Sequence, residues 1–114
     1  MYELDIEKEF SAAHSLKGYK GDCSLLHGHN WTVQAFVAAE ELDEIGIAVD
    51  FKKLKADLEE ILSEFDHKNL SDLEHFRNSN PTSERLARLI YDKLSDKIND
   101  GRVRVTKVRV CESR

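Results

Sequence analysis

The feature that most constrains the fold of this 114-residue sequence is the strict two-residue alternation at its amino terminus. Alternate residues between positions 2 and 14 are apolar except for Lys8, and they end in a histidine: Leu4, Ile6, Phe10, Ala12 and His14. The residues between them begin with an acidic series: Glu3, Asp5, Glu7 and Glu9. Successive side chains of a strand point to opposite faces, so this pattern predicts a half-buried antiparallel strand. His14 is expected on its apolar face.

A second alternating segment begins at His27. One face carries the two histidines followed by an apolar row: His27, His29, Trp31, Val33, Ala35, Val37 and Ala39. The other face carries Asn30, Thr32 and Gln34. Residues two apart on one face of a strand lie about 6.5–7 Å from each other, so both imidazoles can reach one ion. Gly28 between them leaves the opposite face open for close approach of another backbone. Residues 15–26, rich in glycine and charge, predict a loop.

Two helices are predicted in the middle of the chain. Asp50 is a suitable cap for the first, which follows a short predicted strand at Ile47–Val49. Its apolar stripe has helical spacing, and it is expected to end near Asp66: Phe51, Leu54, Leu58, Ile61, Leu62 and Phe65. Residues 81–84 are a strong start signal for the second helix, which ends before Asn99–Gly101. Its stripe is Leu86, Leu89, Ile90, Leu94 and Ile98.

The valine-rich segment 102–112 predicts a last strand. Its valines change phase near Thr106–Lys107, which indicates a bulge there. The expected order is two strands, a short strand, two helices and a strand. This order predicts an α+β domain over residues 1–114, with two helices on one face of an antiparallel sheet. Open edges beside long apolar strands predict an oligomer.

Composition excludes several classes of function. The formal net charge of −5 argues against nonspecific nucleic-acid binding, which depends on an excess of Lys and Arg. No apolar run is long enough for a membrane span. The acidic, alternating start is unlike a secretory signal, so a cytoplasmic protein is expected. Cys23 and Cys111 are therefore interpreted as free thiols rather than as a disulfide.

His14, His27 and His29 are the strongest candidates for a functional site. A single histidine on an inner face is often a hydrogen-bonded core residue, but three that converge from neighbouring strands favour metal binding. Three imidazoles without an obvious fourth protein ligand are typical of a catalytic zinc site. Other imidazole-binding metals remain open. The ion would act as a Lewis acid on a substrate carbonyl or hydroxyl.

Four further residues complete the candidate site. Cys23 is either a fourth ligand or a nearby thiol whose pKa the metal lowers, so that it can exchange protons. Asp66 beside His67 is the usual arrangement for fixing an imidazole tautomer, although most such pairs are solvated. Glu112 lies in phase with buried valines and needs a partner unless the terminus frays. Its carboxylate can accept two parallel hydrogen bonds from an amidine-like edge.

Together these segments resemble the 6-pyruvoyl-tetrahydropterin synthase family. The resemblance rests on Phe10–His14, Cys23–His29, Val49–Phe51, Asp66–His67, Pro81–Glu84 and Val108–Glu112. The three-residue gap between Cys23 and His27 is similar to that of the 6-carboxy-tetrahydropterin synthase branch, which feeds queuosine biosynthesis. The resemblance implies the tunnelling fold, in which subunits join their sheets into a barrel and two trimers stack as a hexamer.

The resemblance also implies a substrate, 7,8-dihydroneopterin triphosphate, and a role for each candidate residue. Zinc on the three histidines would hold the side-chain hydroxyls. Cys23 would move protons, with Asp66 and His67 of a neighbouring subunit completing the relay. Glu112 would anchor the pterin ring, helped by Thr82 and Ser83 across an interface. Lys17 and Lys20 are candidates for the triphosphate.

The predicted reaction releases triphosphate and acetaldehyde and yields 6-carboxy-5,6,7,8-tetrahydropterin. Two related activities remain as alternatives on the same scaffold: synthesis of 6-pyruvoyl-tetrahydropterin and an aldolase-like cleavage of dihydroneopterin. A non-catalytic protein that binds metal or pterin is the alternative from another class.

Overall fold

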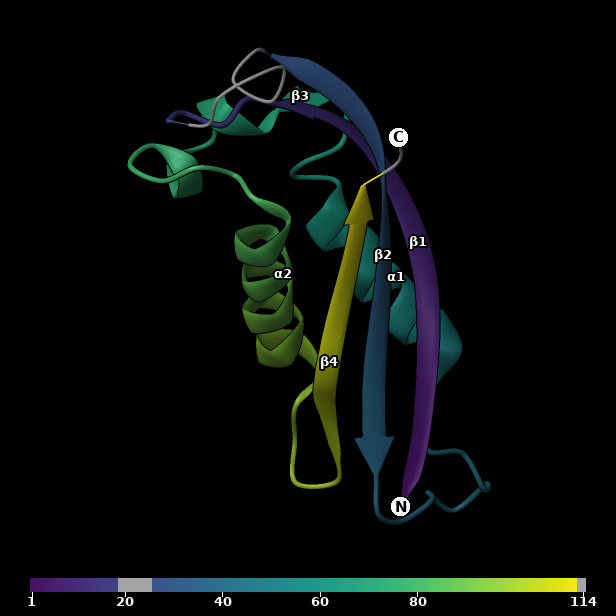
Figure 1. Ribbon diagram of the computed structural model, residues 1–114. Coiled ribbons are helices and arrows are strands. Elements are labelled where there is room, and N and C mark those ends of the chain that lie inside the picture. Colours follow the sequence, from purple (N-terminus) through teal and green to yellow (C-terminus); the bar gives the residue numbers. More distant parts are fainter. Residues whose placement is uncertain (19–25, 113–114) are drawn as a thin grey trace.

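The computed structural model describes residues 1–18 and 26–112 (Figure 1). These residues form an α+β structure, as predicted. The strands are β1 (Tyr2–His14), β2 (His27–Ala39), β3 (Lys68–Asn69) and β4 (Val103–Glu112), and the α-helices are α1 (Phe51–Leu62) and α2 (Ser83–Ile98). Two short 3-10 helices, η2 (Leu70–Asp72) and η3 (Glu74–Phe76), lie between β3 and α2. The strand order in the sheet is β3-β1-β2-β4.

The pairing of β1 with β2 gathers the histidines. The two strands are antiparallel, with a register that runs from Tyr2 opposite Ala39 to His14 opposite His27. His29 lies opposite Ala12, one pleat further along the same face. The alternation is confirmed, because Trp31 and Val33 on this face are fully buried. All three imidazoles therefore meet at one end of the hairpin, on the side of the core.

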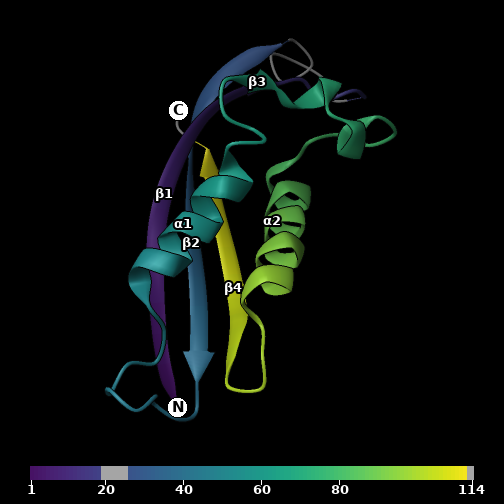
Figure 2. The ribbon, with the colours of Figure 1, turned by 180° about the vertical axis from the view of Figure 1, so that it is seen from behind.

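Both helices cover the apolar face of the sheet, and Figure 2 shows them on the same side of it. Both predicted helix starts are confirmed: the Asp50 carboxylate accepts from the Lys52 amide at 2.9 Å, and the Thr82 hydroxyl accepts from the Arg85 amide at 3.2 Å. The two helices bury Leu54, Leu58, Ile61, Leu62, Leu86, Ile90, Leu94 and Ile98 against the sheet. No helix in residues 1–18 and 26–112 has the length and apolar character that a membrane crossing requires.

The first helix and the short strand before it differ from the prediction. Ile47–Val49 forms no strand, because the Asp43 carboxylate accepts from the Ile45 and Ile47 amides and closes this segment as a loop. Helix α1 ends at Leu62 rather than near Asp66, and residues 63–67 form turns. Phe51, at its first position, is 44% exposed and lies outside the buried stripe.

The sheet is also mixed rather than purely antiparallel. Residues 68–69, for which no strand was predicted, form β3 and pair in parallel with Ala12–Ala13 on the outer edge of β1. A two-residue strand has too few side chains to produce an alternating pattern, so its sequence carries no signal for it. The predicted bulge is confirmed: Phe36 pairs with Lys107 and Val37 with Val105, which leaves Thr106 unpaired.

Candidate metal centre and active site

Three imidazoles pack together at the end of the β1–β2 hairpin. The ring centroids of His14 and His27 are 4.6 Å apart, those of His27 and His29 4.7 Å, and those of His14 and His29 5.7 Å. Trp31, the next residue on the same face of β2, lies edge-on to His14 at 4.9 Å. The rings converge because strand register and alternation place them on one face, as the sequence predicted.

His14 has a fixed tautomer. Its Nδ1 lies 2.9 Å from the carbonyl oxygen of Pro81, just before α2, and a carbonyl can only accept. Nδ1 therefore carries the proton, and Nε2 is left with a lone pair. The His14 side chain is only 1% exposed, and within the described residues its Nε2 has no hydrogen-bond partner. A buried ring nitrogen without a partner is costly, and a bound cation would satisfy it.

Glu112 joins the histidines. Its Oε2 lies 3.1 Å from Nε2 of His29 and 3.8 Å from Nε2 of His14, while its Oε1 accepts from the Ser83 hydroxyl at 3.0 Å. One ligand atom from each of His14, His27, His29 and Glu112 lies within 4.8 Å of the others. Imidazole nitrogen and carboxylate oxygen are both common zinc ligands, so this donor set fits a zinc ion. Glu112 was predicted to bind the substrate, and the structure also places it in the group of residues that could hold a metal ion.

Asp66 and His67 form a second polar group beside β1. Oδ1 of Asp66 accepts from the Ser11 amide at 3.0 Å and lies 3.0 Å from Nδ1 of His67. His67 has a positive φ of 60°, which is uncommon for a residue with a side chain, and its own amide donates to the Ser11 carbonyl. The Ser11 amide, and after it the neighbouring His67, hold the pKa of Asp66 below its usual value, although desolvation opposes them.

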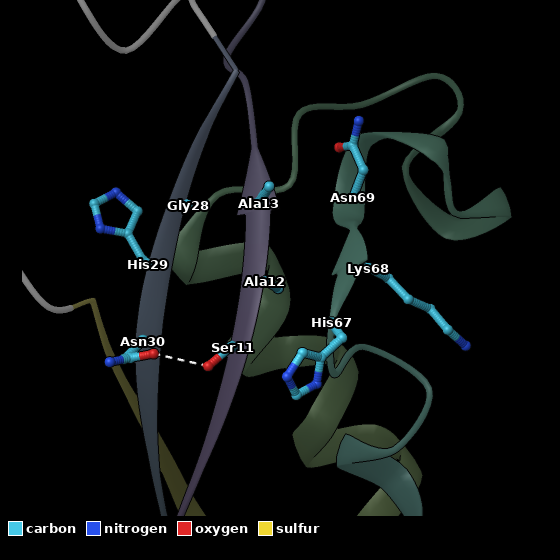
Figure 3. A pocket seen from close by; sticks show the side chains of 9 residues that line it. All are labelled: Ser11, Ala12, Ala13, Gly28, His29, Asn30, His67, Lys68 and Asn69. Carbon is cyan, nitrogen blue, oxygen red and sulfur yellow. Dashed lines mark hydrogen bonds between the residues drawn. The ribbon is translucent and has the colours of Figure 1, made fainter.

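This second group does not meet the metal cluster within one chain. His67 is 81% exposed and lines an open pocket of about 580 Å³ with Ser11, Gly28 and Asn30. In Figure 3 the ring of His29 points away from His67, with β1 and β2 between them. A Cβ atom on Gly28 would meet nothing within 4 Å, so this face is open at Gly28, and no other backbone among the described residues approaches it closely. The pocket is therefore open to a partner from outside the chain.

The other predicted residues have separate positions. Ser83 contacts Glu112, whereas the hydroxyl of Thr82 caps α2. Cys23 lies outside the described residues, so its role stays a prediction. Sequence reasoning did not find the contact between His14 and Pro81, because Pro81 contributes a main-chain oxygen, which no residue type reveals. It also did not place Glu112 beside the histidines, since that contact joins the last strand to the first two.

The lowered pKa of Asp66 makes a testable prediction. Because its carboxylate is stabilised in the folded protein, the contribution of Asp66 to stability is complete above its ordinary pKa of 3.8 and is lost as the pH falls through the lowered value. We expect its side-chain carboxyl carbon to titrate below pH 3.8 in NMR spectra of the folded protein, with the signal assigned through Asp66→Asn. A midpoint at or above 3.8 would contradict the bond from Ser11.

Comparison with known proteins extends these observations over the whole chain. The family description for 6-pyruvoyl tetrahydropterin synthase matches residues 3–114. A Bacillus subtilis protein named 6-carboxy-5,6,7,8-tetrahydropterin synthase is 40% identical over 98 residues, which are 82% of this chain and 65% of that protein. A Synechocystis protein of the same name is 36% identical, covering 95% of this chain and 88% of the relative. The chain thus spans about two thirds of the Bacillus relative and most of the Synechocystis one.

Solved structures of proteins from the same family have a similar fold. The structure of Caenorhabditis elegans 6-pyruvoyl tetrahydropterin synthase superposes with a TM-score of 0.77 at 25% identity, covering 99% of this chain and 96% of that one. The Plasmodium falciparum 6-pyruvoyl tetrahydropterin synthase shares the fold, with a TM-score of 0.69 at 17% identity, over 98% and 97% of the two chains. The match over residues 3–114 and the curated relatives show that this chain belongs to the 6-pyruvoyl tetrahydropterin synthase family of enzymes.

Proposed function

We propose that this protein converts 7,8-dihydroneopterin triphosphate to 6-carboxy-5,6,7,8-tetrahydropterin, with release of acetaldehyde and triphosphate, as a step of queuosine biosynthesis. The observation that carries the proposal is the buried Nε2 of His14, without a hydrogen-bond partner in the described residues and facing His27, His29 and Glu112. The relatives at 36–40% identity that are named 6-carboxy-5,6,7,8-tetrahydropterin synthase support this product over others in the family.

The proposed metal is zinc, held by His14, His27 and His29. When bound, it would supply a Lewis acid that polarises the hydroxyl and carbonyl groups of the substrate side chain. The chain itself prepares this site: the Pro81 carbonyl keeps the proton of His14 on Nδ1, so that Nε2 faces the cluster. Trp31 and the strand register hold the rings in place.

Glu112 is proposed to anchor the pterin ring. A carboxylate accepts two parallel hydrogen bonds from the amidine edge of a pterin, which gives both affinity and orientation. The Ser83 hydroxyl, bonded to Oε1 of Glu112, supports the carboxylate from the first turn of α2. In the free enzyme the other oxygen contacts His29, so pterin binding would draw Glu112 away from the histidines.

The acid/base groups are proposed to come from two subunits. Cys23 would exchange protons with the substrate side chain, and Asp66 would orient His67 of a neighbouring subunit for the same relay. The open pocket around His67 and the separation of His67 from the metal cluster within one chain support this arrangement. We propose that the subunits assemble as in the family: their sheets join into a barrel, and two trimers stack as a hexamer. We place the reaction in the cytoplasm, where Cys23 would remain a reduced thiol.

The deciding experiment is incubation of the purified protein with 7,8-dihydroneopterin triphosphate, followed by identification of every product. We expect acetaldehyde, triphosphate and 6-carboxy-5,6,7,8-tetrahydropterin, loss of all three after treatment with a chelator, and recovery on addition of Zn²⁺. Triphosphate without acetaldehyde would instead establish the 6-pyruvoyl product, which the likeness to the Caenorhabditis elegans enzyme favours as a second candidate. If the protein bound the substrate but formed no product, the proposed reaction would be wrong and the protein would be a non-catalytic pterin-binding protein.

A further inference from the structure

A basic pocket lies close to His14, one of the three clustered histidines. Its volume is about 370 Å³, and its walls come from the segment that follows β1, from η2, from residues 76–81 and from the first turn of α2. Three cationic residues line it, namely Lys17, Arg77 and Arg85. No carboxylate appears among its described lining residues, although the whole chain carries a net charge of −5. The pocket is thus a local concentration of positive charge in an acidic protein.

Among the described residues, the three cations have no anionic partner. Other lysines and arginines form ion pairs, for example Lys53 with Asp57, Arg88 with Asp92 and Lys93 with Glu64. Within residues 1–18 and 26–112, none of Lys17, Arg77 and Arg85 forms an ion pair with a carboxylate. Like charges that gather without counter-ions repel each other, so the arrangement favours a bound anion.

The walls of the pocket are held in place by hydrogen bonds. The Lys17 amide donates to Oδ1 of Asn80 at 2.8 Å, and Nδ2 of Asn80 donates back to the Lys17 carbonyl at 2.8 Å. Nη1 of Arg85 donates to the Asn80 carbonyl at 3.3 Å, which orients the guanidinium group. The Ser15 amide donates to the Ser71 hydroxyl at 3.2 Å and joins the end of β1 to η2. A site formed in advance loses less entropy when its ligand binds.

Two residues of the pocket wall, Ser15 and Pro81, are direct neighbours of His14. Ser15, on the pocket wall, directly follows His14. Pro81, also on the wall, accepts the hydrogen bond from His14 through its carbonyl. The pocket wall is therefore joined to the histidine cluster through His14.

We propose that this pocket binds a polyphosphate chain. Guanidinium groups form paired hydrogen bonds with phosphate oxygens, and serine hydroxyls add further donors. The pocket supplies both, with Arg77 and Arg85 beside Ser15, Ser71 and Ser79. Its compact shape fits a small polyphosphate ester, whereas a nucleic-acid backbone needs an extended basic surface. This inference rests on the proposed function in one respect: it assigns the pocket to the triphosphate of the substrate whose side chain is proposed to lie at the metal centre.

The test is the binding of inorganic tripolyphosphate, measured by isothermal titration calorimetry on the zinc-loaded protein. We expect Arg77→Gln and Arg85→Gln to weaken binding about tenfold each and the double variant about a hundredfold, because each loses a charge-assisted contact. The matched control is Arg88→Gln, one turn along α2 from Arg85 and outside the pocket, which should bind like wild type. Tripolyphosphate also binds zinc, so the zinc content of every variant is measured after titration.

Kinetics separate this inference from the proposed function. In the double variant, KM should rise for 7,8-dihydroneopterin triphosphate, while binding of the dephosphorylated 7,8-dihydroneopterin should not change. Equal tripolyphosphate affinity in wild type and the double variant, or no binding by wild type, overturns the polyphosphate site. If tripolyphosphate binding depends on both arginines but the pterin substrate is not turned over, the pocket stands and the proposed reaction fails.

Discussion

Replacing His29 with alanine is expected to abolish turnover and to lower the affinity for zinc by more than about 100-fold. Loss of an outer-shell partner alone typically costs 10–100-fold in metal affinity, and His29 would be a direct ligand. Its side chain is 18% exposed, and its ring lies at the edge of the core, beside the other histidines and Trp31, so the fold should persist. Zinc affinity is measured by competition with a chromophoric chelator, and the fold by circular dichroism.

The matched control is His75→Ala. His75 is an exposed histidine in η3 that does not belong to the cluster, so zinc binding and activity should remain as in wild type. His14 is a poorer test, because its bond to Pro81 also connects β1 to the start of α2, and its loss would change the fold as well as the site. Zinc affinity of His29→Ala within about threefold of wild type, less than 1 kcal/mol, would refute the metal centre.

Asp66→Asn is expected to reduce kcat by about 10²–10⁴-fold, the usual contribution of a positioned acid/base group. The asparagine side chain keeps an oxygen that can accept from the Ser11 amide, so the local fold should survive. It loses the negative charge that lies 3.0 Å from Nδ1 of His67. Zinc affinity should be unchanged, because Asp66 is not part of the metal cluster. A lower kcat with unchanged zinc affinity would show that Asp66 acts in proton transfer rather than in metal binding.

Mixing the two variants tests whether the site is shared between subunits. If the metal cluster of one subunit works with Asp66 and His67 of its neighbour, oligomers refolded from equal amounts of His29→Ala and Asp66→Asn should recover about a quarter of wild-type activity, since each site draws its halves independently. If both halves came from one chain, every site in the mixture would carry a defect. Activity no higher than that of the separate variants would therefore contradict the shared site.

Local sequence determined the faces of the strands and the starts of the helices. Alternation has a period of two residues, so His14, His27 and His29 could be assigned to the apolar face without knowledge of the fold. The caps at Asp50 and Thr82 involve atoms two or three residues away; the cap at Asp50 was correctly predicted, and so was a helix start within residues 81–84. The two-residue β3 could not be predicted, because its pairing with Ala12–Ala13 depends on the edge of β1 rather than on its own side chains.

Only the tertiary structure decided how the site residues meet. Packing of α2 on the sheet brings the Pro81 carbonyl to His14, 67 positions away in sequence, and thereby fixes the free nitrogen of that ring. Pairing of β4 with β2 places Glu112 opposite Trp31 and within reach of His29. The same fold keeps His67 on the other side of the hairpin, away from the histidines. Sequence patterns report which face a side chain occupies, whereas distances between distant segments depend on how the elements pack.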